Sequence, residues 1–235
     1  DTLGLNHLTW HRGFKLNGQQ IWPQIIEEYI AELKSVESPE FPPELIETLQ
    51  MIPSYYLNYY YATAHKLDEQ KKWPPSRAEE VMALEKDLLR DYADPQRNSP
   101  PEGLLQRGGA FYSTAATQLI NSHFNDLGET HVANVQNQGA VPNWPADWVL
   151  ELPCRVDRKG VHPLPTESLP DVCSGLVAQI NSCALLTARA AITGDRNLLY
   201  QALLVHPLGP SSDQVPTVMD DLLQTHKRWL PQFWN

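Results

Sequence analysis

The spacing of hydrophobic residues changes twice along this chain, which limits the folds that it can adopt. Up to Gly128, apolar side chains recur every three or four residues, as they do on amphipathic helices. Residues 130–139 and 147–157 then show the pattern of β-strands, and helical spacing returns afterwards. The predicted helices cover residues 20–35, 43–50, 76–94, 108–124, 170–192, 196–205 and 213–227. We therefore predict one helix-rich α+β unit with a small antiparallel sheet.

The helix predicted at residues 76–94 has the clearest boundaries. Ser76 and Glu79 form the pattern of a capping box, which satisfies two amide donors at the start of a helix. Asp94 and Pro95 end the helical pattern. We expect this helix to bury a stripe of four side chains, Val81, Leu84, Leu88 and Tyr92.

The composition argues against several classes of protein. Of the 235 residues, 42% are hydrophobic and 20% are charged, which is ordinary for a globular domain. The formal net charge of −10 argues against a broad nucleic-acid interface, because such an interface needs a basic face. No apolar run approaches the roughly 18 residues of a membrane span, and no signal-peptide pattern opens the chain. Cys154, Cys173 and Cys183 form no CxxC pair, so we expect reduced, packed thiols in a cytoplasmic protein.

A histidine, His7, stands in the turn-like run GLNH almost at the start of the chain. It fits a surface or capping role, and it also fits a metal ligand or a general base, since neutral imidazole is a common ligand of transition metals. His11 lies four residues further on, beyond a predicted turn. A metal at His7 would therefore need ligands from distant parts of the protein.

Five tyrosines crowd into seven positions, Tyr55, Tyr56, Tyr59, Tyr60 and Tyr61. On a helix, Tyr56, Tyr59 and Tyr60 share one face. Most of these rings fit an aromatic packing role. A phenol beside a metal or another cation can also be held as phenolate and act as a base.

Two arginines are candidates for binding an anion. Arg77 lies at the first position of a predicted helix, where the helix dipole disfavours a cation unless an anion binds there too. Arg107 precedes Gly108 and Gly109, which allow close approach of the backbone to a ligand or to another helix. Each arginine also fits a solvated surface role.

Amide side chains gather between the two predicted strands, at Asn134, Asn137 and Asn143 around Gly139. They fit a hairpin whose turn is supported by side chains, and they would also suit a sugar or a nicotinamide amide. The chain contains no strand–GxGxxG–helix unit, so the sequence predicts no dinucleotide-binding half within it.

Taken together, these segments resemble the C-terminal half of the family 4 glycoside hydrolases, whose fold is similar to that of lactate and malate dehydrogenases. The resemblance rests on motifs in a fixed order, namely GLNHLTW, PSYYLNYYY, SRAEEVMALEKDLLRDY, RGGAFYSTAA, NVQNQGAVPNWPAD, LELPCRVDRKGVHPL and HPLGP. It is strongest toward the 6-phospho-β-glucosidases. These NAD-dependent enzymes do not use the common two-carboxylate mechanism.

The resemblance implies a redox mechanism and a role for each candidate residue. In the family, NAD⁺ takes a hydride from C3 of the sugar, and a divalent metal, usually Mn²⁺, polarises the C3 oxygen. The family's metal histidine corresponds to His7, and its base, which removes the C2 proton, to Tyr56, with Tyr55 and Tyr59 as alternatives. Substrate binding is implied for Asn6, for Arg77 at the sugar phosphate and for Arg107.

Residues 1–235 would then form the C-terminal substrate and metal domain. The family's GxGS nucleotide-binding half and its metal-binding cysteine precede the GxNH motif and are not in this sequence. We expect a cytoplasmic homo-oligomer acting on a phosphorylated disaccharide or β-glucoside, joined to that NAD-binding half, with no nucleic-acid or membrane partner. The alternatives are a non-catalytic phospho-sugar-binding or oligomerisation module, and an enzyme for α-linked or unphosphorylated sugars.

Overall fold

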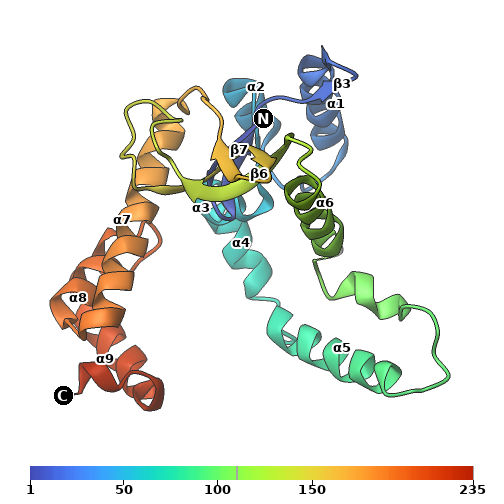
Figure 1. Ribbon diagram of the computed structural model, residues 1–235. Coiled ribbons are helices and arrows are strands. Elements are labelled where there is room, and N and C mark those ends of the chain that lie inside the picture. Colours follow the sequence, from blue (N-terminus) through green and yellow to red (C-terminus); the bar gives the residue numbers. More distant parts are fainter. Residues whose placement is uncertain (110, 235) are drawn as a thin grey trace. The chain divides into compact units, whose positions relative to one another are not determined.

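The computed structural model describes residues 1–109 and 111–234 (Figure 1). The chain divides into two compact units. The first unit comprises residues 1–61, 132–153 and 163–235, and the second comprises 62–131 and 154–162. The sequence predicts a single unit, because the composition does not change where the chain passes from one unit to the other. Each unit is described by itself below.

The strands are short, and most of them belong to one sheet. They are β1 (Thr2–Leu5), β2 (Leu8–His11), β3 (Lys15–Leu16), β4 (Gln19–Gln20), β5 (Ile52–Pro53), β6 (Glu129–Gln136), β7 (Val149–Asp157) and β8 (Gly160–Pro163). The main sheet has the order β5-β2-β1-β7-β6, with β8 paired to β7, while β3 and β4 form a separate pair. The pairs β1–β2, β1–β7 and β2–β5 are antiparallel, as expected for a small antiparallel sheet.

The sequence analysis did not predict β1 and β2. Each strand has four residues, and three consecutive residues of each are buried. Leu3 and Trp10 are completely buried. A strand buried on both faces shows no alternation of polar and apolar residues, so its period cannot reveal it.

The helices of the first unit surround this sheet or pack on one another. They are α1 (Trp22–Ser35), α2 (Pro43–Leu49), η1 (Tyr55–Leu57), α3 (Asn58–Tyr61), α7 (Asp171–Thr193), α8 (Arg196–Val205), α9 (Val215–Thr225), η3 (Lys227–Trp229) and η4 (Pro231–Phe233). Helix α1 packs against α2, and α7, α8 and α9 pack in succession, in orange to red in Figure 1. The predicted helices at 20–35, 43–50, 170–192, 196–205 and 213–227 are thus present with small shifts in their ends.

The second unit contains α4 (Thr63–Gln70), α5 (Arg77–Tyr92), η2 (Glu102–Gln106) and α6 (Tyr112–Phe124). The capping box of α5 is confirmed, because Ser76 and Glu79 each accept a hydrogen bond from the other's backbone amide. The predicted buried stripe of α5 is wrong in part. Leu88 is buried, whereas Tyr92 is 56% exposed. Within its unit α5 packs mainly on η2, whose Gly103 lies against Leu84 and Leu88, so the buried face is short.

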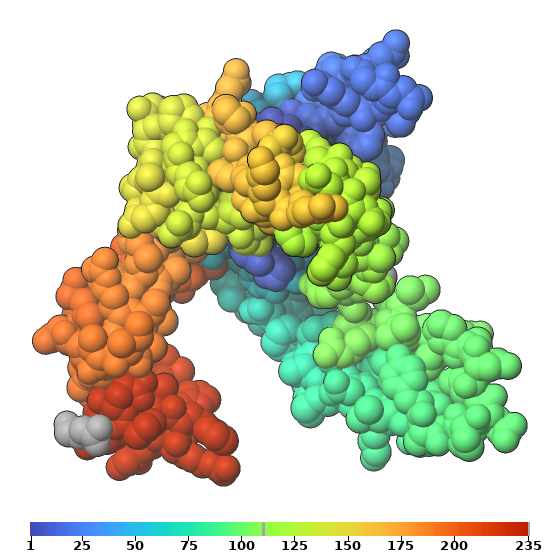
Figure 2. Space-filling model, in the orientation of Figure 1, coloured from blue at the N-terminus to red at the C-terminus, as the bar shows by residue number. Residues whose placement is uncertain are grey.

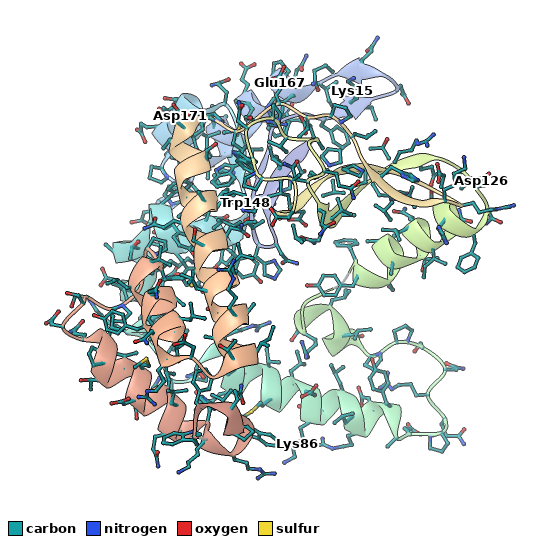
Figure 3. The ribbon with its side chains drawn as sticks, turned by 60° about the vertical axis from the view of Figure 1, so that its left-hand side comes forward. Lys15, Lys86, Asp126, Trp148, Glu167 and Asp171 are labelled. Atoms are coloured by element: carbon teal, nitrogen blue, oxygen red, sulfur yellow. The ribbon has the colours of Figure 1, made fainter. Side chains whose placement is uncertain are left out.

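Helix α6 begins later than the predicted helix at 108–124. Gly108 and Gly109 have φ angles of 94° and 74°, which a right-handed helix does not allow. Ala110, which the prediction included, lies outside the described residues. Asp126 lies where α6 gives way to β6 (Figure 3), and its carboxylate accepts a hydrogen bond from the amide of Arg158.

Helix α7 is the one helix among the described residues that is long and apolar enough to cross a membrane. It has 23 residues, and its most apolar 18-residue window has a mean hydropathy of 1.3 and is 17% buried. The sequence analysis overlooked this segment because Gln179, Asn181 and Arg189 interrupt its apolar residues. One such helix is weak support for a membrane span, since core helices of globular proteins meet the same criterion.

Candidate functional site

The first unit presents His7 at the tip of the β1–β2 hairpin. Leu5 pairs with Leu8, so Asn6 and His7 alone form the turn. His7 has a φ of 65°, a left-handed conformation that few residues other than glycine adopt. Gly4 makes this tight return possible, because a side chain there would collide with the carbonyl oxygen of Leu8. The hairpin therefore leaves the side chains of Asn6 and His7 exposed.

The tyrosine run passes beside this hairpin because β5 pairs with β2. Pro53 lies opposite Trp10, and the next residue, Ser54, donates its amide hydrogen to the carbonyl of Thr9 at 2.8 Å. The chain then forms η1 and α3, with Leu57 completely buried as their anchor. Strand pairing thus brings residues 55–60 to the tip of the hairpin.

His7 and Tyr56 meet directly. Their rings are stacked, with centroids 4.5 Å apart and an angle of 24° between the planes. They share a hollow of about 270 Å³ that is lined by Asn6, His7, Leu8, Tyr56, Tyr59, Tyr60, Ile180 and Leu208. The three tyrosines that the helical spacing placed on one face therefore line one hollow. Ile180 of α7 and Leu208 beyond α8 add an apolar wall.

The surroundings distinguish the five tyrosines. Burial raises the pKa of Tyr60, and burial together with Cys173 raises that of Tyr61, whose hydroxyl lies 4.0 Å from the Cys173 sulfur. A raised pKa disfavours phenolate and makes both side chains poor bases. Tyr55 packs edge-on against Tyr56, with ring centroids 5.9 Å apart, but is not one of the residues lining the hollow. Tyr56 and Tyr59 remain the best-placed phenols.

Glu151 is a residue that the sequence analysis missed. It lies opposite Gly4 in the β1–β7 pairing, and its carboxylate interacts with the Thr9 hydroxyl and electrostatically with the His7 side chain. Burial raises the pKa of Glu151, and these two partners act in the opposite direction. The only signal in the sequence was an acidic residue inside the otherwise apolar strand VLELPC.

The described residues do not by themselves form a metal site. No group of three His, Cys, Asp or Glu side chains among them is arranged to hold a metal ion. His7 offers one nitrogen ligand to the hollow. Cys154, Cys173 and Cys183 form no disulfide, and burial raises the pKa of Cys173 to about 11, which disfavours the thiolate that metals bind.

The two candidate arginines lie near each other in the second unit. Arg77 donates hydrogen bonds to the Glu80 carboxylate at 3.2 Å and to the carbonyl of Gln106 at 2.9 Å. Arg107, the next residue after Gln106, has its guanidinium 3.8 Å from the Glu85 carboxylate. Both side chains remain accessible, at 58% and 44%. The start of α5 and the end of η2 therefore present two cations together.

The amides between β6 and β7 include one that is structural. Asn137 is completely buried, donates to the carbonyls of Val141, Trp144 and Pro145, and accepts from the amide of Val141. Its side chain holds the loop closed and has no free donor for a ligand. Of the two open interpretations, a hairpin supported by side chains fits Asn137.

Comparisons with known proteins agree with this arrangement. Residues 2–209 match the family 4 glycosyl hydrolase C-terminal domain. A probable 6-phospho-beta-glucosidase of Bacillus subtilis (strain 168) is 35% identical over 240 residues, and a 6-phospho-beta-glucosidase of Escherichia coli (strain K12) is 31% identical over 244. Each match covers 99% of this chain and 54% of the relative. The chain thus spans about half the length of the curated relatives that it matches.

Solved structures show the same correspondence. The 6-phospho-beta glucosidase of Thermotoga maritima, with NAD and glucose-6-phosphate bound, superposes with a TM-score of 0.89 at 29% identity. Its complex with manganese, NAD⁺ and glucose-6-phosphate gives a TM-score of 0.88. These matches cover 97% of this chain and 54% and 53% of the relative. A 6-phospho-alpha-glucosidase from gut microorganisms, at 22% identity, shares the fold with a TM-score of 0.82.

Proposed function

Because this chain belongs to the family 4 glycosyl hydrolases, as their C-terminal domain, we propose that it is the substrate-binding half of a 6-phospho-β-glucosidase. The observation that carries the proposal is the stack of His7 on Tyr56 in one hollow, formed by the two motifs to which the family resemblance assigned the chemistry. The β-linkage is favoured because β-glucosidases of this family are 30–35% identical to the chain, whereas enzymes for α-linked phosphorylated sugars are 26–28% identical.

In this proposal the phenol of Tyr56 removes the proton from C2 of the sugar. The ring is 46% exposed and stacks on His7, so a sugar can approach the hydroxyl from the hollow. Asn6 neighbours His7 in the same turn and can hydrogen-bond a sugar hydroxyl through its amide. We propose Arg77 and Arg107 of the second unit as phosphate-binding groups, since two accessible guanidinium groups suit a dianion.

His7 would contribute one nitrogen to a divalent metal, with the remaining ligands supplied from outside the described residues. NAD⁺ would be held by a nucleotide-binding half beyond these residues. The T. maritima chains in the structures with NAD, one of which also contains manganese, are nearly twice as long as the matched region. When bound, the metal would polarise the C3 oxygen, and NAD⁺ would accept the hydride from C3. We also propose a cytoplasmic location, which is supported by the three cysteines that form no disulfide.

We further propose that the protein forms a homo-oligomer. In the second unit Leu105, Phe111, Tyr112 and Phe124 are between 71% and 80% exposed. Large apolar side chains that are exposed on one unit support a contact surface there. Residues 77–106, which include α5 and η2, are turquoise to green in Figure 2 and belong to the same unit.

The proposal is tested in the full-length protein with a chromogenic 6-phospho-β-glucoside, with NAD⁺ and Mn²⁺ supplied. Tyr56→Phe removes the base but retains the aromatic ring that stacks on His7. We expect turnover to fall by about 10²- to 10⁴-fold. Exchange of the C2 proton with D₂O, followed by mass spectrometry of the sugar product, should slow by a similar factor.

Tyr55→Phe is the matched control and should retain most of the activity. If Tyr56→Phe loses less than about tenfold, which is below the range for a general base, Tyr56 is not the base. The same assay with the unphosphorylated glucoside tests the substrate class, because the proposal expects little turnover of it. A full-length protein that binds glucose-6-phosphate but turns over neither glucoside would favour the alternative, a non-catalytic phospho-sugar-binding module.

A further inference from the structure

Ser54 uses its hydroxyl in an unusual way for its position. It is the N-cap residue of η1, where a serine normally accepts a hydrogen bond from an amide of its own helix. The Ser54 side chain makes no such capping bond. Its hydroxyl instead donates to the carbonyl oxygen of His7 at 2.9 Å, across 47 residues of sequence.

Two backbone bonds complete the contacts of Ser54. Its amide donates to the carbonyl of Thr9 at 2.8 Å, and its carbonyl accepts from the amide of Leu57 at 2.9 Å. Ser54 therefore connects the end of the His7 turn, strand β2 and η1. Tyr56 follows two residues later, so its ring position depends on this junction.

The His7 turn needs such support. A non-glycine residue with a φ of 65° is strained relative to its favoured conformations. A hydrogen bond on the His7 carbonyl restrains the orientation of that peptide group. It thereby limits the rotation that would swing the imidazole away from Tyr56.

We propose that Ser54 is a positioning residue whose hydroxyl holds the His7 turn so that the imidazole stays stacked on Tyr56. Ser54 does not line the hollow and acts through His7 and Tyr56. The effect of Ser54 on the stack depends only on the contacts of Ser54, His7 and Tyr56. Its effect on turnover rests on the proposed function.

The stack has a direct spectroscopic signature. Ring protons held over the face of another aromatic ring are shifted upfield in the proton NMR spectrum. The His7 signals can be assigned by their loss in His7→Asn. Tyr56→Leu removes the second ring and so defines the unstacked position of these signals.

We expect Ser54→Ala to move the His7 ring signals most of the way to their position in Tyr56→Leu. Ser54→Thr keeps a hydroxyl and should leave them near the wild-type position. In the full-length protein, Ser54→Ala should lower kcat by about tenfold to a hundredfold through misplacement of the two side chains, with Ser54→Thr restoring it. Ser54→Gly, which is also tolerated at N-caps, replaces the alanine variant if that one does not fold.

Ser168→Ala is the matched control, because the Ser168 hydroxyl donates a similar 3.0 Å bond to the carbonyl of Pro142. It should change neither the His7 signals nor kcat. The proposal is overturned if Ser54→Ala leaves the His7 signals at the wild-type position while Tyr56→Leu shifts them. If Ser54→Ala shifts the signals but kcat stays unchanged, the positioning role stands and the assignment of His7 and Tyr56 to catalysis is wrong.

Discussion

Asn58 and Asn137 are both completely buried in the first unit, yet their amide groups have opposite surroundings. Asn137 makes four hydrogen bonds to the backbone of the loop that it closes. Among the described residues, neither amide atom of Asn58 has a hydrogen-bond partner. Burying an unpaired amide costs free energy, whereas a fully paired one stabilises its loop. At the scale of single residues, identity and burial therefore do not determine the energetic role.

This contrast predicts opposite outcomes for the same substitution. Asn137→Leu removes the side-chain partner of the Val141 amide and of the Val141 and Trp144 carbonyls, and it should lower the free energy of unfolding by at least about 2 kcal/mol. Asn58→Leu removes two unpaired polar atoms and should leave that free energy within about 1 kcal/mol or raise it. Urea unfolding followed by circular dichroism measures both. Equal losses in the two variants would mean that Asn58 has a stabilising partner.

The turn between β7 and β8 shows how one carboxylate organises an element. Asp157 accepts a hydrogen bond from the amide of Lys159 at 2.8 Å, and it pairs with His162 at 3.1 Å and Arg155 at 2.8 Å. The hydrogen bond from the backbone amide of Lys159 lowers the pKa of Asp157 most, followed by the interactions with His162 and Arg155. The carboxylate therefore stabilises the folded hairpin only while it is ionised.

The lowered pKa predicts a pH dependence of stability. An unfolded aspartate titrates near pH 3.9, so the contribution of Asp157 is complete above about pH 5 and is lost as the pH falls below about 4. Urea unfolding at several pH values between 6 and 3 should show this loss. Asp157→Asn should flatten the acid side of the profile. Asp126→Asn, whose side chain accepts one hydrogen bond from the Arg158 amide, is the comparison variant. Identical slopes for wild type and Asp157→Asn would contradict the prediction.

At the scale of the whole molecule, the apolar core is divided unevenly. In the described part of the second unit, the buried apolar side chains are Leu88, Pro101, Cys154 and Val156. The first unit contains the other buried apolar side chains, including the sheet residues Leu3 and Trp10. Stability within a protein follows local burial, so the two units should open independently and with different free energies.

Hydrogen exchange of the 235-residue chain tests this difference. We expect the amides of α5 and α6 to exchange well before those of β1, β2 and α7, because fewer buried contacts hold the second unit closed. Mass spectrometry of peptic fragments resolves these segments. Exchange measured at several protein concentrations separates intrinsic stability from protection by a second copy. Equal protection of both units at every concentration would contradict the prediction.

Helices with long amphipathic patterns and clear ends could be predicted without the structure. The capping box of Ser76 and Glu79 and the proline near the start of α2 are local signals that act within a few residues. Family resemblance drew attention to His7 and Tyr56, and helical spacing placed Tyr56 with Tyr59 and Tyr60. These features depend on side chains that are neighbours along the chain.

Only the tertiary structure decided how the site is assembled. Strands β1 and β2 are buried on both faces and carry no readable period, yet their hairpin creates the His7 turn. The pairing of β5 with β2 and the Ser54 hydroxyl then bring the tyrosine run to that turn. Ile180, Leu208 and Glu151 reach the same region from distant segments. These contacts depend on pairing between segments that are distant in the sequence. The spacing of residues along the chain does not show which segments pair.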